Sequence, residues 1–212
     1  MIQITRFIFN SFMVNNYILW DETKECVIVD ASCYDNSEKK EFTGFLETNK
    51  IKPVRHINTH CHIDHVLGNQ FVVDTYHVYP EYHKDSLPFL YPAREIGKSF
   101  GYRIDQVPEA KGYLEDGDIV TFGNSGLKVL YTPGHAEGSI CLYNEKQGFV
   151  ITGDVLFKDT VGRTDLPGSD FDKLMKSIKT KLFTLPDNTV VYPGHGSETT
   201  IGYEKINNPF IR

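Results

Sequence analysis

Hydrophobic and polar residues alternate at the start of the chain with the two-residue period of a half-buried strand. This pattern predicts strands over residues 3–9, 16–20 and 26–30, with polar turns between them. From 36 to 49 the period becomes helical, because Phe42, Phe45 and Leu46 recur on one face. Pro53 is expected to close this helix, and 54–58 returns to a short strand. A histidine-rich run over 59–65 follows that strand and leads into a predicted helix over 66–73.

The second half of the chain repeats the order of strands followed by a helix. Strands are predicted over 119–122, 127–131, 139–143 and 148–152. Residues 170–183 form the clearest amphipathic helix, with Asp170 as its N-cap. A last strand over 189–192 leads to Gly194 and His195. Two halves of this kind predict an α/β (α+β) fold with four layers, an αββα sandwich.

Residues 76–112 depart from this pattern. Aromatic residues are mixed there with Pro80, Pro88, Pro92 and Pro108, which predicts a partly helical insertion rather than a core element. Two interpretations stay open for it. It is either a lid or acyl-pocket wall over a site, or a hydrophobic cluster that packs on itself.

Composition narrows the class of protein. A chain of 212 residues suits a single domain over 1–212, and its hydrophobic share of 40% suits a globular protein. A net charge of -6 argues against a nucleic-acid partner, because binding phosphates needs a concentrated basic face. No signal peptide or membrane span is recognisable, and the four cysteines form no CxxC pair. We therefore expect a cytoplasmic protein with reduced thiols and no membrane partner.

Candidate metal ligands stand at the ends of the predicted strands. Imidazole nitrogen and carboxylate oxygen are the ligands that zinc and iron take in hydrolytic sites. One such residue alone is more often structural, and we interpret His56, His77 and His83 in that way. A cluster of three histidines within six positions has no such explanation on a solvated surface. The candidates are His60, His62, Asp64 and His65 in the cluster, and His135, Asp154 and His195 farther along the chain.

These motifs, in this order, resemble the metallo-β-lactamase superfamily over essentially the whole chain, and the glyoxalase II branch within it. The resemblance implies a four-layer metallo-β-lactamase sandwich and two divalent metal ions, zinc foremost, with iron or manganese as alternatives. It implies that His60, His62 and His135 hold one ion. By the same resemblance Asp64, His65 and His195 hold the second ion, and Asp154 bridges the two.

The segment over 162–168 follows Asp154 where glyoxalase II enzymes place a cation against the glutathione carboxylate. Arg163 is thus a candidate substrate-binding residue, since its guanidinium can form a bidentate fork. An alternative is a salt bridge that holds the loop, to Asp159 or Asp165. The C-terminal helical domain of full-length glyoxalase II has no counterpart in this sequence. The chain is therefore similar to single-domain, glyoxalase-II-like hydrolases, and the sequence leaves open whether glutathione is the thiol.

These features lead us to expect a binuclear hydrolase that cleaves a small-molecule thioester such as S-lactoylglutathione. Metal-activated hydroxide would be the nucleophile, with Asp64 and Asp154 as catalytic residues. The nearest alternative is a mono-iron persulfide dioxygenase whose iron sits on His60, His135 and Asp154. A β-lactamase and a non-enzymatic metal-binding module are weaker alternatives. The sequence leaves open whether the protein is a monomer or a homodimer.

Overall fold

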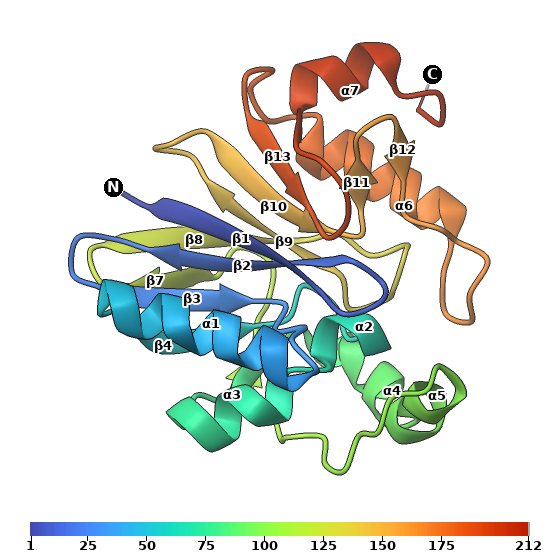
Figure 1. Cartoon of the computed structure of the whole chain (residues 1–212). Coiled ribbons are helices and arrows are strands. Elements are labelled where there is room, and N and C mark those ends of the chain that lie inside the picture. The colour runs from blue at the N-terminus through green and yellow to red at the C-terminus, as the bar shows by residue number, and fades with distance from the viewer. Residues whose placement is uncertain (212) are drawn as a thin grey trace.

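The computed structural model describes residues 1–211 and arranges them in four layers, helices outside and two sheets inside (Figure 1). This is the predicted αββα sandwich. Within the described residues the first sheet has six strands in sequence order: β1 (Gln3–Phe9), β2 (Val14–Trp20), β3 (Glu25–Val29), β4 (Lys52–Ile57), β5 (Pro80–Tyr82) and β6 (Gly112–Tyr113). The second, also six-stranded over residues 1–211, runs β14 (Thr199–Thr200), β13 (Val190–Pro193), β10 (Phe149–Gly153), β9 (Ile140–Asn144), β8 (Ser125–Tyr131) and β7 (Ile119–Phe122).

The main hydrophobic core lies between the two sheets. Leu19 and Val27 of the first sheet pack there with Val129 and Leu142 of the second, and all four side chains are buried. Strands β2, β9 and β10 are buried along their whole length, because layers cover both of their faces. Burial of this apolar surface is the principal stabilising contribution to the sandwich.

Helices cover the outer face of each sheet. Over the first sheet lie α1 (Asn36–Asn49) and α3 (Asn69–Tyr76), and over the second lie α6 (Phe171–Ser177), a π-helical turn (Ile178–Leu182) and α7 (Ile201–Asn207). Helix α1 has its predicted bounds and begins with a capping box between Asp35 and Glu38. It ends at Lys50 in a left-handed conformation, so the expectation that Pro53 closes it is wrong. Pro53 lies inside β4 instead.

Parallel strand pairs bring the carboxyl ends of several strands to one edge of the sandwich. Strand β3 is parallel to β4, and β10 is parallel to β13. The segments that follow these strands therefore meet at the same end of the molecule. His60 follows β4, Asp154 follows β10, and His195 follows β13.

The helix predicted over 66–73 is broken into two. A short helix α2 (Ile63–Val66) carries Asp64 and His65, and α3 begins only at Asn69. The break falls at Gly68, whose N–H donates to the carbonyl of Ala31 at 2.8 Å. A Cβ at Gly68 would lie 2.9 Å from that same carbonyl oxygen, so only glycine permits this approach.

Residues 76–112 contribute more to the core than predicted. Strand β5 joins the first sheet between β4 and β6, and Tyr82 is buried, so placing the whole segment outside the core was wrong. The remainder contains α4 (Leu87–Leu90) and α5 (Ala93–Ser99), with Leu90 in a hydrophobic cluster beside Cys61 and Val66. No helix within residues 1–211 is long and apolar enough to cross a bilayer.

Candidate metal centre

All seven candidate ligands meet at the edge where the parallel strands end. Their ligand atoms form overlapping groups, each with atoms within 4.8 Å of one another. The residues come from four separate segments, so the centre exists only in the folded chain. The three groups are His60, His62 and His135; His60, His65 and Asp154; and Asp64, His65 and His195.

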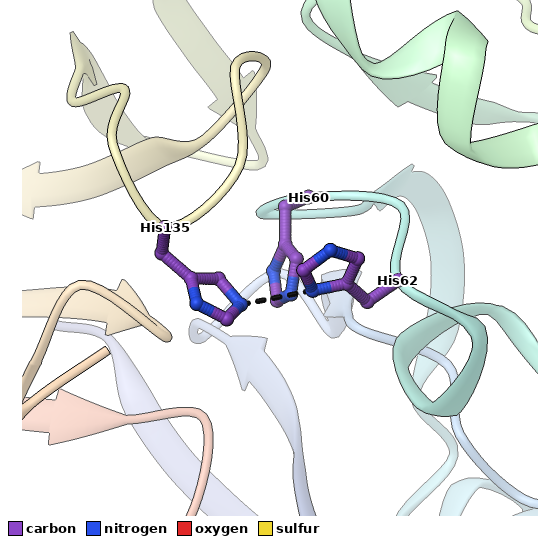
Figure 2. Close-up of side chains that lie close together, drawn as sticks. All are labelled: His60, His62 and His135. Atoms are coloured by element: carbon purple, nitrogen blue, oxygen red, sulfur yellow. Dashed lines mark hydrogen bonds between the residues drawn. The ribbon is translucent and has the colours of Figure 1, made fainter. Parts of the chain in front are cut away.

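Three imidazoles make up the first group (Figure 2). His62 Nδ1 and His135 Nε2 face each other at 2.9 Å. The ring of His60 lies edge-on to both partners, with centroids at 4.8 Å from His62 and 5.0 Å from His135. Three imidazole nitrogens within 4.8 Å of one another can supply three of the four ligands of a tetrahedral cation.

The third group, Asp64, His65 and His195, combines two imidazoles and a carboxylate. Asp64 Oδ2 lies 3.2 Å from His195 Nε2 and 3.6 Å from His65 Nε2. Asp154, from the second group, lies between the first and the third group. One of its oxygens is 3.4 Å from His65 Nε2, while the other is 3.5 Å from His195 Nε2 and 3.7 Å from His135 Nε2. Asp154 is therefore placed to share its carboxylate between both groups.

Unpaired buried atoms test whether a cation suits this centre. His60 Nε2, His65 Nε2 and Asp154 Oδ1 are buried and have no hydrogen-bond partner within the described residues. Leaving such atoms unpaired costs on the order of 1–3 kcal/mol each. They are also the atoms that face the other candidate ligands. A divalent cation would satisfy all three, so the donor set suits one.

The outward-facing nitrogen of three rings is held by a hydrogen bond. His65 Nδ1 lies 3.0 Å from Asp30 Oδ2, and His135 Nδ1 lies 2.9 Å from the carbonyl oxygen of Arg163. His195 Nδ1 lies 3.0 Å from the carbonyl oxygen of Phe12. These acceptors keep the hydrogen on Nδ1 and leave Nε2 free to bind a metal.

Asp30 is a functional residue that the sequence reasoning missed. It is buried, and it also accepts hydrogen bonds from the backbone N–H and the hydroxyl of Thr59, both at 2.7 Å. It thereby fixes the start of the histidine-rich run as well as the ring of His65. A carboxylate directly after a buried hydrophobic strand was the available signal, since β3 and β4 are parallel neighbours.

The loop that carries His195 is clamped by the start of β2. Asn15 donates its side-chain amide to the carbonyls of Pro193 and Gly196, both at 2.9 Å, and Tyr17 Oη donates to Pro193 at 2.7 Å. Gly194 lies against the centre itself. A Cβ there would overlap Asp154 Oδ1 and the ring of His65. The expectation that glycines let the backbone approach a crowded centre therefore agrees with the geometry at Gly194.

The two sides of the centre differ in the direction of their histidine pKa shifts. Burial, with help from neighbouring imidazoles, lowers the pKa of His60 well below its usual value and that of His62 to about 4. Burial alone would raise the pKa of Asp154, but the imidazoles of His65, His195 and His135 outweigh it and lower that pKa. Burial would lower the pKa of His65 and that of His195, but the carboxylates of Asp64 and Asp154 outweigh it and raise both. Metal binding therefore has to displace protons from these two rings, whereas His60 and His62 are already neutral.

A pocket of about 1090 Å³ opens directly onto the centre. Arg163 lines it, with an exposed side chain whose guanidinium forms a fork with Asp165, Nε–Oδ1 2.6 Å and Nη2–Oδ2 2.7 Å. The loop-holding ion pair considered for Arg163 is therefore present, and its partner is Asp165. Lys158 also lines the pocket, and within residues 1–211 it forms no ion pair.

Comparisons with known proteins agree with this geometry. The chain is 33% identical to the hydroxyacylglutathione hydrolase GloC of Haemophilus influenzae, over 95% of this chain and 94% of that protein. The crystal structure of the B3 metallo-beta-lactamase BLEG-1 superposes with a TM-score of 0.87, at 33% identity and 99% coverage of both chains. TTHA1623, crystallised in a di-iron-bound form, also gives 0.87, at 32% identity, covering 97% of this chain and 99% of that one.

The metallo-beta-lactamase superfamily model matches residues 10–195, a range that contains all seven candidate ligands. Family and side-chain clusters together indicate that the site uses divalent metal. The chain therefore belongs to the metallo-beta-lactamase superfamily of metallohydrolases.

Proposed function

We propose that the protein hydrolyses a small-molecule thioester at a two-metal centre. The observation that carries this proposal is the pair of ligand groups on either side of Asp154, each open to the same pocket. His60, His62 and His135 would hold one ion, while Asp64, His65 and His195 would hold the other. Divalent ions in such a site lower the pKa of bound water to about 7 and polarise a carbonyl group.

The chain's own residues supply the rest of the chemistry. Asp154 would keep its carboxylate ionised between the two groups, in line with its lowered pKa. Asp64 Oδ2, beside His195 Nε2, is placed to accept a proton from the attacking water. The departing thiolate needs little assistance, because a thiol has a pKa near 8.5 and its anion is a weak base. The similarity to GloC supports thioester hydrolysis, since GloC is a hydroxyacylglutathione hydrolase by name and such a substrate is a thioester.

Arg163 is our candidate for binding a carboxylate of the thiol portion. Its guanidinium is already paired with Asp165, so a substrate carboxylate would have to compete for the same fork. Lys158 is a second cation at the pocket. Selectivity for an anionic thiol such as glutathione would therefore depend on these two side chains. Both line the pocket and neither is a candidate metal ligand.

The decisive experiment combines metal content with turnover. Protein purified without added metal should contain close to two equivalents of zinc, iron or manganese, and should release thiol from S-lactoylglutathione. His65→Asn should remove one equivalent and most turnover. His77→Asn is the matched control, because His77 is exposed and remote from the centre. Full turnover by His65→Asn with one metal bound would overturn the two-metal proposal.

The same preparation separates the alternatives. A mono-iron dioxygenase would contain one iron, consume oxygen with a persulfide substrate, and fail to cleave the thioester. Cephalosporin hydrolysis would support a β-lactamase, an activity worth testing because BLEG-1 is described as a B3 metallo-beta-lactamase. Metal binding without any of these activities would support a non-enzymatic module. The di-iron form of TTHA1623 keeps iron among the metals to be measured.

A further inference from the structure

The pocket has an apolar wall that the proposed chemistry does not use. Helices α4 and α5 and the segment after α5 contribute Phe89, Ile96 and Phe100 to it, and the turn between β1 and β2 contributes Phe12. In Figure 1, α4 and α5 lie at the same end of the sandwich as that turn and α2. None of the charged side chains of α5 within the described residues lines the pocket.

This wall begins at the metal centre. The ring of Phe89 lies edge-on to His62, with centroids 5.0 Å apart. From there the wall continues to the ring of Phe12, which meets Phe100 edge-on at 5.2 Å. A reacting carbonyl placed at the centre would therefore direct its substituent along aromatic and aliphatic side chains.

The wall also exposes apolar surface that a ligand could cover. Phe100 is 56% exposed and Ile96 is 38% exposed, although both line the pocket. A lactoyl group is small and carries a hydroxyl, so it would leave most of this surface in water. At about 1090 Å³ the pocket is far larger than such a group needs.

We propose that the pocket accepts a thioester whose acyl group is large and apolar, such as a hexanoyl or benzoyl group, held by Phe12, Phe89, Ile96 and Phe100. This inference rests on the proposed thioesterase function and names its substrate class. Continuity of the wall with His62 is what assigns the acyl group, rather than the thiol, to this side. The thiol portion then lies toward Lys158 and Arg163, two cations that also line the pocket.

The test uses thioesters of one neutral thiol, N-acetylcysteamine, with acetyl, lactoyl, hexanoyl and benzoyl groups. Burial of each additional methylene group raises kcat/KM by up to about fourfold. From the acetyl to the hexanoyl ester, kcat/KM should therefore rise at least tenfold. Ile96→Ala and Phe100→Ala should lower kcat/KM for the hexanoyl ester severalfold more than kcat/KM for the acetyl ester. Ile119→Ala is the matched control, since Ile119 is 57% exposed on β7 and does not line the pocket. Equal kcat/KM for acetyl and hexanoyl esters would overturn the inference.

Binding of unreactive thioethers keeps the inference separate from the proposed function. S-hexyl-N-acetylcysteamine should bind at least tenfold more tightly than the S-methyl compound by calorimetry, and Phe100→Ala should remove most of that difference. If this holds and no thioester is cleaved, the thioesterase proposal fails and the apolar subsite stands. Equal affinities for the two thioethers would overturn the subsite. The subsite would also be overturned if the wall serves self-association. In that case Phe100→Ala would change the molecular mass of the protein in light scattering and leave the acyl preference intact.

Discussion

Asp30 illustrates how residues outside the ligand set govern the centre. It binds no metal in our proposal, yet one of its oxygens orients His65 and the carboxylate also anchors Thr59. Its backbone has a φ of 53°, an unfavourable conformation for a residue other than glycine. We infer that the contacts of the carboxylate to His65 and Thr59 offset this local cost.

Replacing Asp30 should therefore weaken metal binding. In Asp30→Asn one oxygen acceptor is lost, and we expect a loss of about 10–100-fold in affinity for the ion on His65, with turnover falling in parallel. Titration with a competing chelator would measure the metal affinity of the variant and of the parent protein. Asp21→Asn is the matched control, because Asp21 is equally buried and bonds only to the turns around Thr23 and Asn124. Unchanged metal affinity in Asp30→Asn would contradict the positioning role.

Two nearby glycines should respond differently to the same substitution. Gly194→Ala places a methyl group on Asp154 and His65, so metal content and activity should both collapse. Gly196→Ala meets nothing within 4 Å, although its φ is 73°. We expect it to cost only about 1 kcal/mol of stability and to retain the metal. Metal analysis and thermal unfolding of both variants would distinguish a steric effect at the centre from general strain in the loop.

At the scale of elements, the periodic ones could be predicted from sequence. The bounds of α1 and β7 match the prediction. The buried residues of α1 recur at helical spacing, and those of β7 alternate with exposed ones. Strand β5 could not be found, since it is short and pairs in parallel with distant β4. The same limit applies to the site. Candidate ligands that follow predicted strands could be named from the sequence. The contacts of Phe12 with His195 and of Asn15 with its loop could not, because they join residues far apart in the sequence.

Strand β4 carries His56, a buried histidine that bonds to Asn69 of α3 at 3.1 Å. Burial lowers the pKa of His56 to about 4. Between about pH 6.5 and about pH 4, His56 is protonated in the unfolded chain but stays neutral in the folded protein. The free energy of unfolding therefore falls as the pH drops from about 6.5 toward 4. Between pH 7 and 5 this loss should be about 2 kcal/mol.

Denaturant unfolding of chelated protein at pH 7 and pH 5 would measure the effect of His56. His56→Gln should lose about 2 kcal/mol less than the parent protein over that interval. If this variant does not fold, NMR titration of the parent protein gives the same information. A His56 imidazole that becomes charged near pH 6.5 would contradict the prediction.

At the scale of the whole molecule, the core and the metal centre are separate. The core between the sheets contains none of the seven candidate ligands. Removing metal with EDTA should therefore abolish turnover and lower Tm by roughly 10 °C, while unfolding stays cooperative. Calorimetry and circular dichroism with and without chelator would test this. A chain that loses its secondary structure on chelation would show that the metal is part of the folding core.

The turn between β1 and β2 belongs both to the metal centre and to the apolar wall of the pocket. The carbonyl oxygen of Phe12 holds His195, while its ring stands in the wall of the pocket. A ligand that shifts this turn must change how well His195 can serve its metal. Thermodynamic linkage then makes the effect reciprocal: the factor by which such a ligand alters metal affinity equals the factor by which the metal alters ligand affinity.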